Sequence, residues 1–589
     1  MYNRRENPAC SGTILPCGCT TGRRRMTEET KRTGYPSIDK PWLKYYSEEA
    51  ISAPLPQCTM YQYIWKNNKD HLSDIAMRYY GTKITYGKLF ATVEKTAAAF
   101  YAMGVRAGDI VTVMSMHTPE AICAMYALNY IGAVANMVYM TLSEKEILHT
   151  IENTQSKLFL VLDAALEKAE AVKRELPCPV VVLGVPDSMP PHIKLGYRLK
   201  AKPKKRTFLT WKDFLAKGTG PAPMAEDHAA PAVIVYTSGT TGEPKGVELS
   251  NDNLNAVVAQ CYYSGKYYGR GETGLFILPL FFGFGISMLH LCLRYGINLN
   301  LWIELEPNLI GKAFQKEKPN RFVGGPAIID GFIKNVSGDL SYILEFTGGG
   351  GSLSPEKEQE LNDFLEKNHA NAKYTVGYGM TEFASAVCMQ HPQNYRAGSL
   401  GLPLVHATIK IIDPDSEKEL QYNETGEMCF TTPSMMSGYY KAPDETAQIS
   451  LKDTGGTIWL RTGDLGHVDE DGFVYFEGRI KRIYITTGKG GDTINKIFPQ
   501  RIEECLEAHP DVDSCGVIVL PDTVQINVSV AYVTLKQPCR EDAVDTLMFL
   551  ARAELPEHLQ PAAIHILDTM PMTPSGKIDY RALEQLAAQ

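Results

Sequence analysis

The sequence lacks an excess of positive charge. Its 59 lysine and arginine residues are outnumbered by 67 aspartate and glutamate residues, and the formal net charge is −8. A protein that grips nucleic-acid phosphates carries a broad basic surface, which this composition excludes. We therefore expect no nucleic-acid partner, and a site for an anionic ligand must be built locally.

Cysteine is sparse as well. The 13 cysteines are an odd number spread over 589 residues, without the density of a small disulfide-bonded secreted domain. This pattern favours reduced thiols and a cytoplasmic protein. Cys10, Cys17 and Cys19 lie close together, but tetrahedral zinc requires a further ligand and none follows nearby. We expect no metal site at this cluster.

The N-terminal segment contains no apolar stretch long enough for a secretory signal. We expect residues 1–35 to form a disordered leader, with translation from Met26 as an alternative start. Residues 121–140 are uncharged and long enough to span a membrane, but they include Asn129 and Asn136 and have no basic flanks. They predict a buried helix followed by a short strand, so we expect no integral membrane association.

Helical segments alternate with short apolar runs along most of the chain. Residues 86–103 have a helical period, and apolar runs follow at 109–116, 157–163 and 179–185, with a second such series over 232–377. This alternation predicts an α/β fold with mainly parallel sheets. Residues 398–478 show short strands and turns instead, which predicts a small β-rich subdomain. We expect a large N-terminal domain over 36–480 and a small α+β domain over 481–589.

The segment YTSGTTGEPKGV, residues 236–247, is typical of a loop that holds phosphate groups. Its glycines let backbone amides turn inward, its hydroxyl side chains add donors, and Lys245 supplies a mobile positive charge. Its spacing differs from that of the P-loop. The candidate phosphate-binding residues are Thr237, Ser238, Gly239, Thr240, Thr241, Gly242 and Lys245.

Four further motifs follow in order: TGGGGSLSPE at 347–356, GYGMTE at 377–382, RTGDLG at 461–466 and PMTPSGK at 571–577. The bare backbone of the first suits the face of a nucleobase. Thr381 and Glu382 offer oxygens to a hard cation such as Mg²⁺. Asp464 can accept hydrogen bonds from two ribose hydroxyls, and Lys577 lies on a turn near the C-terminus.

These five motifs, in this order, resemble the acyl-adenylate-forming enzymes, which include acyl-CoA synthetases, adenylation domains and firefly-type luciferases. The similarity extends from about Thr85 to Arg581. It implies a large N-terminal domain of two β/α layers plus a small β-barrel, and a mobile C-terminal domain hinged at Lys481. It also implies that adenosine is bound by Gly349, Gly350, Gly351, Tyr378, Gly379, Asp464 and Arg479.

The resemblance implies a two-step reaction that uses ATP, Mg²⁺ and CoA. A carboxylate is a poor electrophile, and adenylation exchanges its oxide leaving group for AMP. Because two anions must approach each other, neutralisation by Lys577 and by Mg²⁺ on Glu382 should dominate the first step. In the second step a thiol attacks, and rotation at Lys481 moves Lys577 away.

Three departures from the family pattern qualify this resemblance. Phe282 stands where many members have a histidine near the acyl carboxylate, and Asn251 replaces a frequent histidine after the phosphate loop. A plain helix N-cap at Ser250 or Asn251 explains the second segment equally well. The loop at 486–496 is longer than usual, and its Lys489 and Lys496 either contact CoA or a carrier protein or are simply solvated.

We expect a stand-alone ATP-dependent carboxylic acid:CoA ligase whose partners are small molecules. Phe281, Phe282 and Gly283 suggest an apolar slot for a fatty or other apolar organic acid. One alternative is an adenylating enzyme that loads a separate carrier protein, which is less favoured because the chain ends twelve residues after Lys577. Another is a non-catalytic nucleotide or acyl sensor. Lone histidines and tyrosine doublets such as Tyr439-Tyr440 are expected only to pack.

Overall fold

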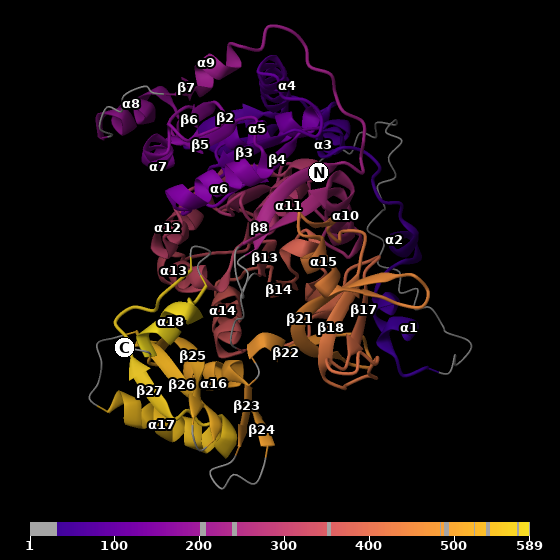
Figure 1. Cartoon of the computed structure of the whole chain (residues 1–589), viewed down its shortest axis with the longest axis vertical. Coiled ribbons are helices and arrows are strands. Elements are labelled where there is room, and N and C mark those ends of the chain that lie inside the picture. Colours follow the sequence, from indigo (N-terminus) through magenta and orange to yellow (C-terminus); the bar gives the residue numbers. More distant parts are fainter. Residues whose placement is uncertain are drawn as a thin grey trace, which may run out of the picture.

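The computed structural model describes residues 32–200, 208–237, 244–349, 355–482, 484–487, 494–522, 525–536, 542–573 and 577–587. It has a large N-terminal domain and a small C-terminal domain, both of mixed α/β structure (Figure 1). The predicted fold class is therefore confirmed.

Among the residues that the structure describes, the first sheet of the large domain has eight strands, in the order β19-β9-β8-β4-β3-β5-β6-β7. Its strands are β3 (Ile110–Met114), β4 (Val134–Met137), β5 (Phe159–Leu162), β6 (Val180–Leu183), β7 (Leu209–Thr210), β8 (Pro231–Thr237), β9 (Lys245–Ser250) and β19 (Gly438–Tyr439). Strands β8, β4, β3, β5, β6 and β7 run parallel, whereas β9 and β19 pair antiparallel. The helices that go with it are α4 (Tyr86–Ala102), α5 (Pro119–Tyr130), α6 (Glu144–Thr154), α7 (Leu166–Ala171), α8 (Pro191–Lys200) and α9 (Trp211–Leu215).

The second sheet has nine strands in the order β16-β15-β14-β13-β12-β10-β11-β1-β2. Its strands are β1 (Ile75–Tyr79), β2 (Thr82–Thr85), β10 (Thr273–Phe276), β11 (Asn298–Leu301), β12 (Arg321–Val323), β13 (Glu345–Gly348), β14 (Tyr374–Tyr378), β15 (Cys388–Met389) and β16 (Leu402–Pro403). Its helices are α3 (Met60–Asn68), α10 (Asn251–Tyr263), α11 (Gly283–Tyr295), α12 (Pro307–Glu317), α13 (Ile329–Asn335) and α14 (Pro355–Lys367). In this sheet the neighbouring strands β1, β11, β10, β12, β13 and β14 run parallel, as predicted.

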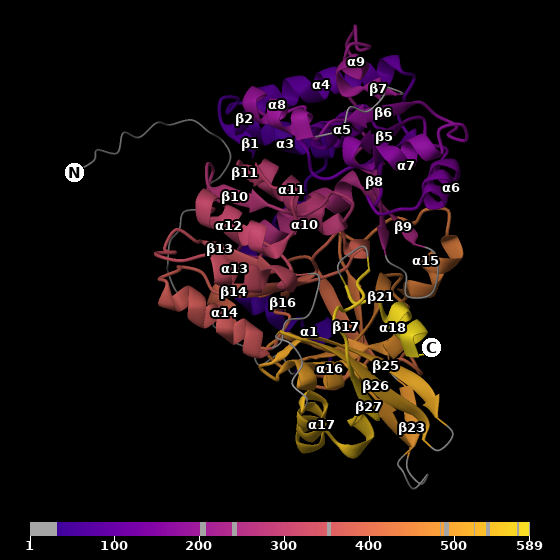
Figure 2. The ribbon, with the colours of Figure 1, turned by 90° about the vertical axis from the view of Figure 1, so that its left-hand side faces the viewer.

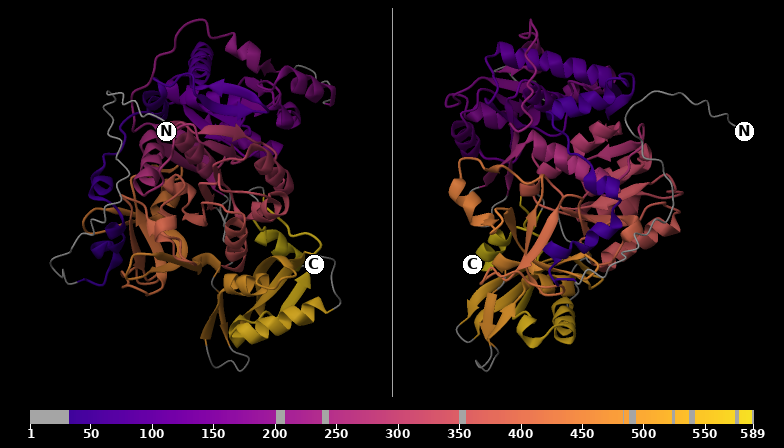
Figure 3. Two further views of the ribbon diagram at one scale, coloured as in Figure 1. Left: turned by 180° about the vertical axis from the view of Figure 1, so that it is seen from behind. Right: turned by 90° about the vertical axis from the view of Figure 1, so that its right-hand side faces the viewer.

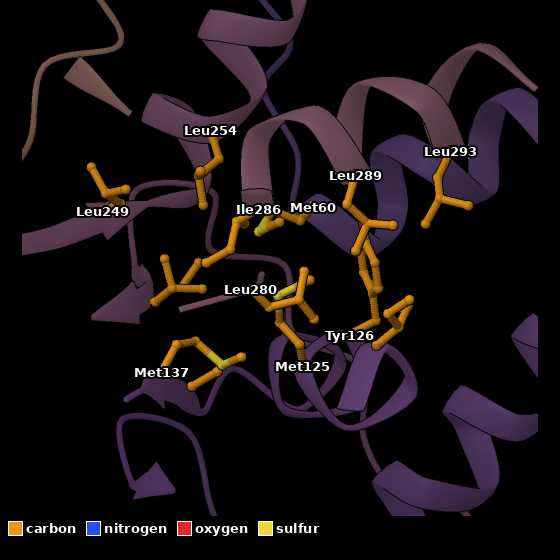
Figure 4. Close-up of a cluster of buried hydrophobic side chains, with 14 of the residues drawn as sticks. Met60, Met125, Tyr126, Met137, Leu249, Leu254, Leu280, Ile286, Leu289 and Leu293 are labelled. Carbon is orange, nitrogen blue, oxygen red and sulfur yellow. The ribbon is translucent and has the colours of Figure 1, made fainter. Parts of the chain in front are cut away.

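Side-chain caps and a shared core fix the helices between the two sheets. Thr85 caps α4, Thr118 caps α5 ahead of a proline, and Ser250 forms a capping box with Asn253 at α10. Figure 4 shows an apolar cluster to which α5 and α10 contribute. Its labelled side chains come from α3, α5, β4, β9, α10 and the α11 region: Met60, Met125, Tyr126, Met137, Leu249, Leu254, Leu280, Ile286, Leu289 and Leu293.

The stretch at 121–140 forms α5 and β4, and nearly all of it is buried. A helix and a strand were predicted here, and the break between them falls near Gly132, which has a φ of +74°. Among the described residues, no helix combines the length and the apolar character needed to cross a membrane.

The β-rich subdomain is an antiparallel sheet of β17 (Thr408–Ile412), β18 (Gly426–Thr431), β21 (Ile458–Val468), β20 (Ser450–Lys452) and β22 (Val474–Arg479), with α15 (Pro443–Ile449) beside it. The resemblance led us to expect a closed barrel, but the pairings of the described strands leave the sheet open because β17 and β20 each pair along one edge only. Helices α1 (Pro36–Asp39) and α2 (Glu48–Ser52) lie nearby, and the N–H of Tyr422 donates to the carbonyl of Gly34.

The C-terminal domain lies below the β-rich sheet and α14, as Figures 2 and 3 show from three sides. A short 3₁₀ turn, Ile480–Arg482, connects it to β22. The domain contains β23 (Tyr484–Thr487), β24 (Ile494–Ile497), α16 (Pro499–Glu507), β25 (Val512–Asp522), β26 (Ile526–Leu535), α17 (Ala543–Glu554), β27 (Ala563–Ile566) and α18 (Tyr580–Ala587).

A separate aromatic core lies between the second sheet and α12–α14. Phe332 is 1% exposed, and its ring centre lies 4.9 Å from that of Phe314 and 5.0 Å from that of Phe346. Because the close-packed neighbours cannot fill the space, Phe332→Ala should lower the free energy of unfolding by about 3–5 kcal/mol. All five tryptophans precede residue 481, so tryptophan fluorescence during urea unfolding reports on the large domain. Leu305→Ala, at a side chain 46% exposed, is the control and should leave the transition unchanged.

Candidate functional site

The predicted site residues gather where the second sheet, the β-rich sheet and the C-terminal domain meet. Strands β13 and β14 run parallel, so the glycines that end them reach the same edge of the sheet. The register pairs Gly348 with Val376, which brings Gly349 beside Gly377. Gly350 and Gly351 lie outside the described residues.

The glycines permit a close approach of backbones that side chains would prevent. A Cβ on Gly348 would lie 1.6 Å from the hydroxyl of Tyr374, and one on Gly379 would lie 1.8 Å from the carbonyl oxygen of Ser385. A Cβ on Gly349 would lie 3.2 Å from the carbonyl oxygen of Gly377. The ends of β13 and β14 therefore present bare backbone, which we call the glycine slot and which would suit the flat face of a planar ring.

Tyr378, Asp464 and Arg479 form one group that is joined by a hydrogen bond and an ion pair. The hydroxyl of Tyr378 donates to Oδ2 of Asp464 at 2.8 Å, and Nε of Arg479 lies 3.0 Å from Oδ1. Asp464 and Arg479 are register partners on β21 and β22. Burial raises the pKa of Asp464, while Arg479, the Tyr378 hydroxyl and Lys577 act to lower it.

Oδ1 of Asp464 has no hydrogen-bond donor of good geometry among the described residues, although it is buried. A buried carboxylate oxygen without a donor is unfavourable, so a ligand hydroxyl that donates to it would be stabilised there. Tyr378 follows Gly377 in the glycine slot and also binds Asp464, so the slot and this carboxylate lie close together. The arrangement fits a nucleoside whose sugar hydroxyls reach Asp464.

Glu382 lies in the 3₁₀ turn Thr381–Phe383 and is 5% exposed. Its Oε1 accepts a hydrogen bond from the Tyr439 hydroxyl at 2.7 Å. Burial raises the pKa of Glu382, and the hydrogen bond from Tyr439 and the charges of Arg479 and Lys245 oppose that rise. The Glu382 carboxylate, together with the hydroxyl of the preceding Thr381, would be a hard-oxygen donor set that fits Mg²⁺ held by one carboxylate and substrate phosphates.

The two ends of the predicted phosphate loop are described, and they lie side by side. Thr237 ends β8, Lys245 begins β9, and the two residues are register partners. Nζ of Lys245 lies 5.1 Å from the ring centre of Tyr439, so it points toward the Glu382 side of the site. Ser238, Gly239, Thr240, Thr241 and Gly242 lie outside the described residues.

Lys577 reaches this site from the C-terminal domain. It lies on a turn in which the N–H of Thr573 donates to the Lys577 carbonyl at 2.6 Å and Met572 bridges to Ile578. Although the residue as a whole is exposed, desolvation of its amino group lowers the pKa of Lys577. The positive charge of Arg479 lowers it further and Asp464 opposes the change, so the three groups share one electrostatic environment.

The segment after Arg479 is anchored in the C-terminal domain. Arg482 donates from Nη1 and Nη2 to the two carboxylate oxygens of Glu503 at 3.1 and 2.7 Å and lies over the Tyr580 ring. Lys481 stands between Arg479 and Arg482 in the 3₁₀ turn. Motion of the C-terminal domain would therefore act on the backbone at Lys481, while Arg482 moves with that domain.

The predicted acyl-pocket residues form the entry to α11. The rings of Phe281 and Phe282 lie 4.8 Å apart, and those of Tyr139 and Phe281 lie 5.2 Å apart. A Cβ on Gly283 would lie 3.3 Å from Cγ2 of Thr381. The aromatic cluster thus lies beside the turn that holds Glu382, with Phe282 packed on Tyr139 rather than in a polar contact.

Two other expectations concern residues around the site. Ser250 is the N-cap of α10, and the buried Oδ1 of Asn251 accepts hydrogen bonds from the Met60 N–H and the Asn129 amide, so Asn251 has a structural role. Most of the long loop at 486–496 lies outside the described residues, including Lys489.

Tyr439 is the residue at this site that sequence reasoning missed. We expected the Tyr439-Tyr440 doublet only to pack, yet the Tyr439 hydroxyl binds Glu382. The pairing of β19 with β9 places it there, because Tyr439 is the register partner of Val247, two residues after Lys245. No local pattern in the sequence signals this contact, because Tyr439 and Glu382 lie 57 positions apart.

Two family models match the chain. Residues 64–440 match the AMP-binding enzyme, and residues 501–577 match the AMP-binding enzyme C-terminal domain. The chain is 28% identical over 566 residues to a long-chain-fatty-acid–CoA ligase of Bacillus subtilis (strain 168), covering 92% of this chain and 97% of that protein. It is 26% identical over 512 residues to the 4-coumarate–CoA ligase CCL1 of Humulus lupulus, covering 85% and 88%.

Solved structures share the fold. The anthranilate CoA ligase AuaEII in complex with anthranoyl-AMP superposes with a TM-score of 0.76 at 21% identity, covering 91% of this chain and 99% of that one. ATP-bound MatB from Rhodopseudomonas palustris superposes with a TM-score of 0.76 at 21% identity, covering 89% and 98%.

Replacing Tyr439 tests the electrostatics of Glu382. Tyr439→Phe keeps the ring but removes the hydrogen bond that lowers the Glu382 pKa, so that pKa should rise further above its ordinary value. Less carboxylate is then ionised at a given acidic pH, and Mg²⁺ affinity should fall off at a higher pH than in the wild type. Mg²⁺ titrations across acid to neutral pH in the presence of nucleotide measure this shift. Tyr440→Phe is the matched control, and an equal shift in both variants would contradict the assignment.

Proposed function

The chain belongs to the AMP-binding enzyme family, the acyl-adenylate-forming enzymes, and is an acid–thiol ligase; we propose that it converts a fatty or other apolar organic acid to its CoA thioester. ATP is consumed in forming an acyl-AMP with release of pyrophosphate, and CoA then displaces AMP. The proposal concerns the acid, the residues and the order in which they act.

The position of Lys577 is the observation on which the proposal mainly rests. A lysine from the C-terminal domain shares the electrostatic environment of Asp464 and Arg479 in the large domain. A protein that only bound nucleotide would not need a second domain to deliver a positive charge to the sugar end of the slot. The arrangement suits catalysis of adenylation, in which charge accumulates between the acid and the α-phosphate.

In the adenylation step, the residues neutralise and orient two anions. The glycine slot and Tyr378 receive adenine, Asp464 accepts hydrogen bonds from the ribose, and Lys245 with the phosphate loop holds the β- and γ-phosphates. Lys577 contacts the acid carboxylate and the α-phosphate. Bound Mg²⁺, held by Glu382 beside Thr381, would supply further positive charge to the phosphates.

In the second step, the C-terminal domain has to move. Once pyrophosphate leaves, Lys577 blocks the side from which a thiol approaches. Rotation at Lys481, with Arg482 and Glu503 moving as part of the C-terminal domain, withdraws Lys577 and opens a path for CoA.

The aromatic entry to α11 supports an apolar acid. Phe281 is 7% exposed and packs with Tyr139 and Phe282, so an acid bound against these rings would contact aromatic carbon. The curated relatives named above act on a long-chain fatty acid and on 4-coumarate, two acids with apolar bodies. We further propose a cytoplasmic protein, since the nine cysteines among the described residues are free thiols.

Mass spectrometry of the purified protein with Mg-ATP, CoA and pooled fatty, aromatic, bile and amino acids tests the proposal. The expected product is one acyl-CoA, preceded by its acyl-AMP. Acyl-AMP without thioester would favour an adenylating enzyme that loads a carrier protein. Binding of ATP without either product would favour a sensor and overturn the proposal.

Lys577→Ala separates the two half-reactions. Loss of one preorganised charge contact should lower the rate of acyl-AMP formation by about 10²- to 10³-fold. Thioester formation from supplied acyl-AMP should be spared, because Lys577 has left the site by then. Lys536→Ala, which removes an exposed lysine of the same domain, is the control. Equal losses in both half-reactions would refute the role assigned to Lys577.

A further inference from the structure

Lys266 is a buried lysine that the reaction described above does not use. It is 6% exposed and lies on one face of the second sheet, behind the strands that end in the glycine slot. We propose, on the basis of the nucleotide site assigned above, that Lys266 is a positioning residue that fixes the carboxyl ends of β13 and β14 and so sets the adenine slot.

The end of α10 drives this lysine inward. The N–H of Gly265 donates to the Tyr262 carbonyl, and the N–H of Lys266 donates to the Cys261 carbonyl. With a φ of +103° at Gly265, these bonds form a Schellman motif, which terminates the helix and fixes the direction of the next residue. The lysine is thus placed by local backbone chemistry.

Its ammonium connects the two strands of the slot. Nζ of Lys266 donates to Oε1 of Glu345 at 2.6 Å and to the Thr347 hydroxyl at 2.9 Å, both on β13. It lies 3.5 Å from the Thr375 hydroxyl on β14, and the two threonine hydroxyls are 3.1 Å apart. Thr347 and Thr375 are register partners, so one ammonium group spans a rung of the parallel ladder.

A second cation, Arg321, binds the other carboxylate oxygen of Glu345. Nη1 of Arg321, on β12, donates to Oε2 of Glu345 at 2.9 Å. Burial opposes the charged form of Glu345, but Lys266 and Arg321 more than offset it and lower its pKa to about 2. Both carboxylate oxygens are therefore satisfied, and three adjacent strands are connected through one charged group.

This face of the sheet differs from its opposite face. Phe322, Phe346 and Tyr374 alternate with the polar residues and pack on the apolar core under α12–α14. Parallel strands are ordinarily apolar on both faces, and a buried ion pair contributes little net stability compared with an apolar packing. The charges of Lys266, Glu345 and Arg321 are better explained by the fixed spacing that they impose on β12, β13 and β14.

The spacing of β13 and β14 at the two threonines determines the spacing of the glycines that follow them. Gly348 and Gly349 directly follow Thr347, and Gly377 and Tyr378 follow Thr375 by two and three positions. A change in spacing at the threonine rung would be transmitted to the distance between Gly349 and Gly377. The phosphate loop connects β8 and β9 of the other sheet, so a change in the spacing of β13 and β14 should leave phosphate binding unchanged.

Calorimetric titration of the full-length protein with AMP and, separately, with pyrophosphate tests the proposal. Lys266→Met should weaken AMP binding by about tenfold, the scale of one charged hydrogen bond, and leave pyrophosphate binding unchanged. Thr375→Val should shift AMP affinity in the same direction by less, and it serves if Lys266→Met does not fold. Arg270→Met is the matched control, because Arg270 pairs with Asp74 at 3.3 Å away from β13 and β14.

The outcomes separate this inference from the function on which it rests. If the wild type binds no AMP, the proposed function and the inference both fail. If the wild type binds AMP and both variants bind it equally well, the inference alone is overturned. Equal weakening of AMP and pyrophosphate would indicate general loosening of the domain and would also overturn it.

Discussion

The pair formed by Asp464 and Arg479 is the interaction on which the site depends. Neighbouring antiparallel strands hold the two residues opposite each other, and Tyr378 from the second sheet donates to the same carboxylate. Arg479 is the last residue of β22 and the joint to the C-terminal domain begins at the next residue. Under the proposed function, the charge that positions the sugar and the backbone about which the C-terminal domain would turn therefore belong to one continuous segment.

One residue, Tyr439, likewise connects Lys245 at the phosphate side of the site with Glu382 at the cation side. Strand β9 begins with Lys245 and pairs with β19, which presents Tyr439 to Glu382. The ring of Tyr439 lies beside the ammonium of Lys245, while its hydroxyl stabilises the carboxylate of Glu382. A displacement of Lys245 would therefore change the surroundings of Glu382 through a single tyrosine.

The sequence predicted the fold and the motifs because both depend on local patterns. Alternating strands and helices follow from residue periodicity, and glycine-rich or charged motifs are readable without the structure. Tyr439 and Lys266 were not readable, since each acts on a residue far along the chain: Tyr439 on Glu382, 57 positions away, and Lys266 on Glu345, 79 positions away. Whether the β-rich sheet closes depends on pairings between edge strands, which local pattern does not determine either.

The charges at the site give domain closure a physical reason. Lys245, Arg479 and Lys577 bring three cations to a region whose two carboxylates, Glu382 and Asp464, are both destabilised by burial. Burial and then the positive charge of Arg479 lower the pKa of Lys577, so the proposed closure of the C-terminal domain would be opposed while no anion is present. A bound polyphosphate would reverse that balance because it neutralises the excess positive charge. In the proposed second step, loss of pyrophosphate would restore the repulsion between Arg479 and Lys577 and favour withdrawal of the lysine, so the same three cations would act on the domain in both directions.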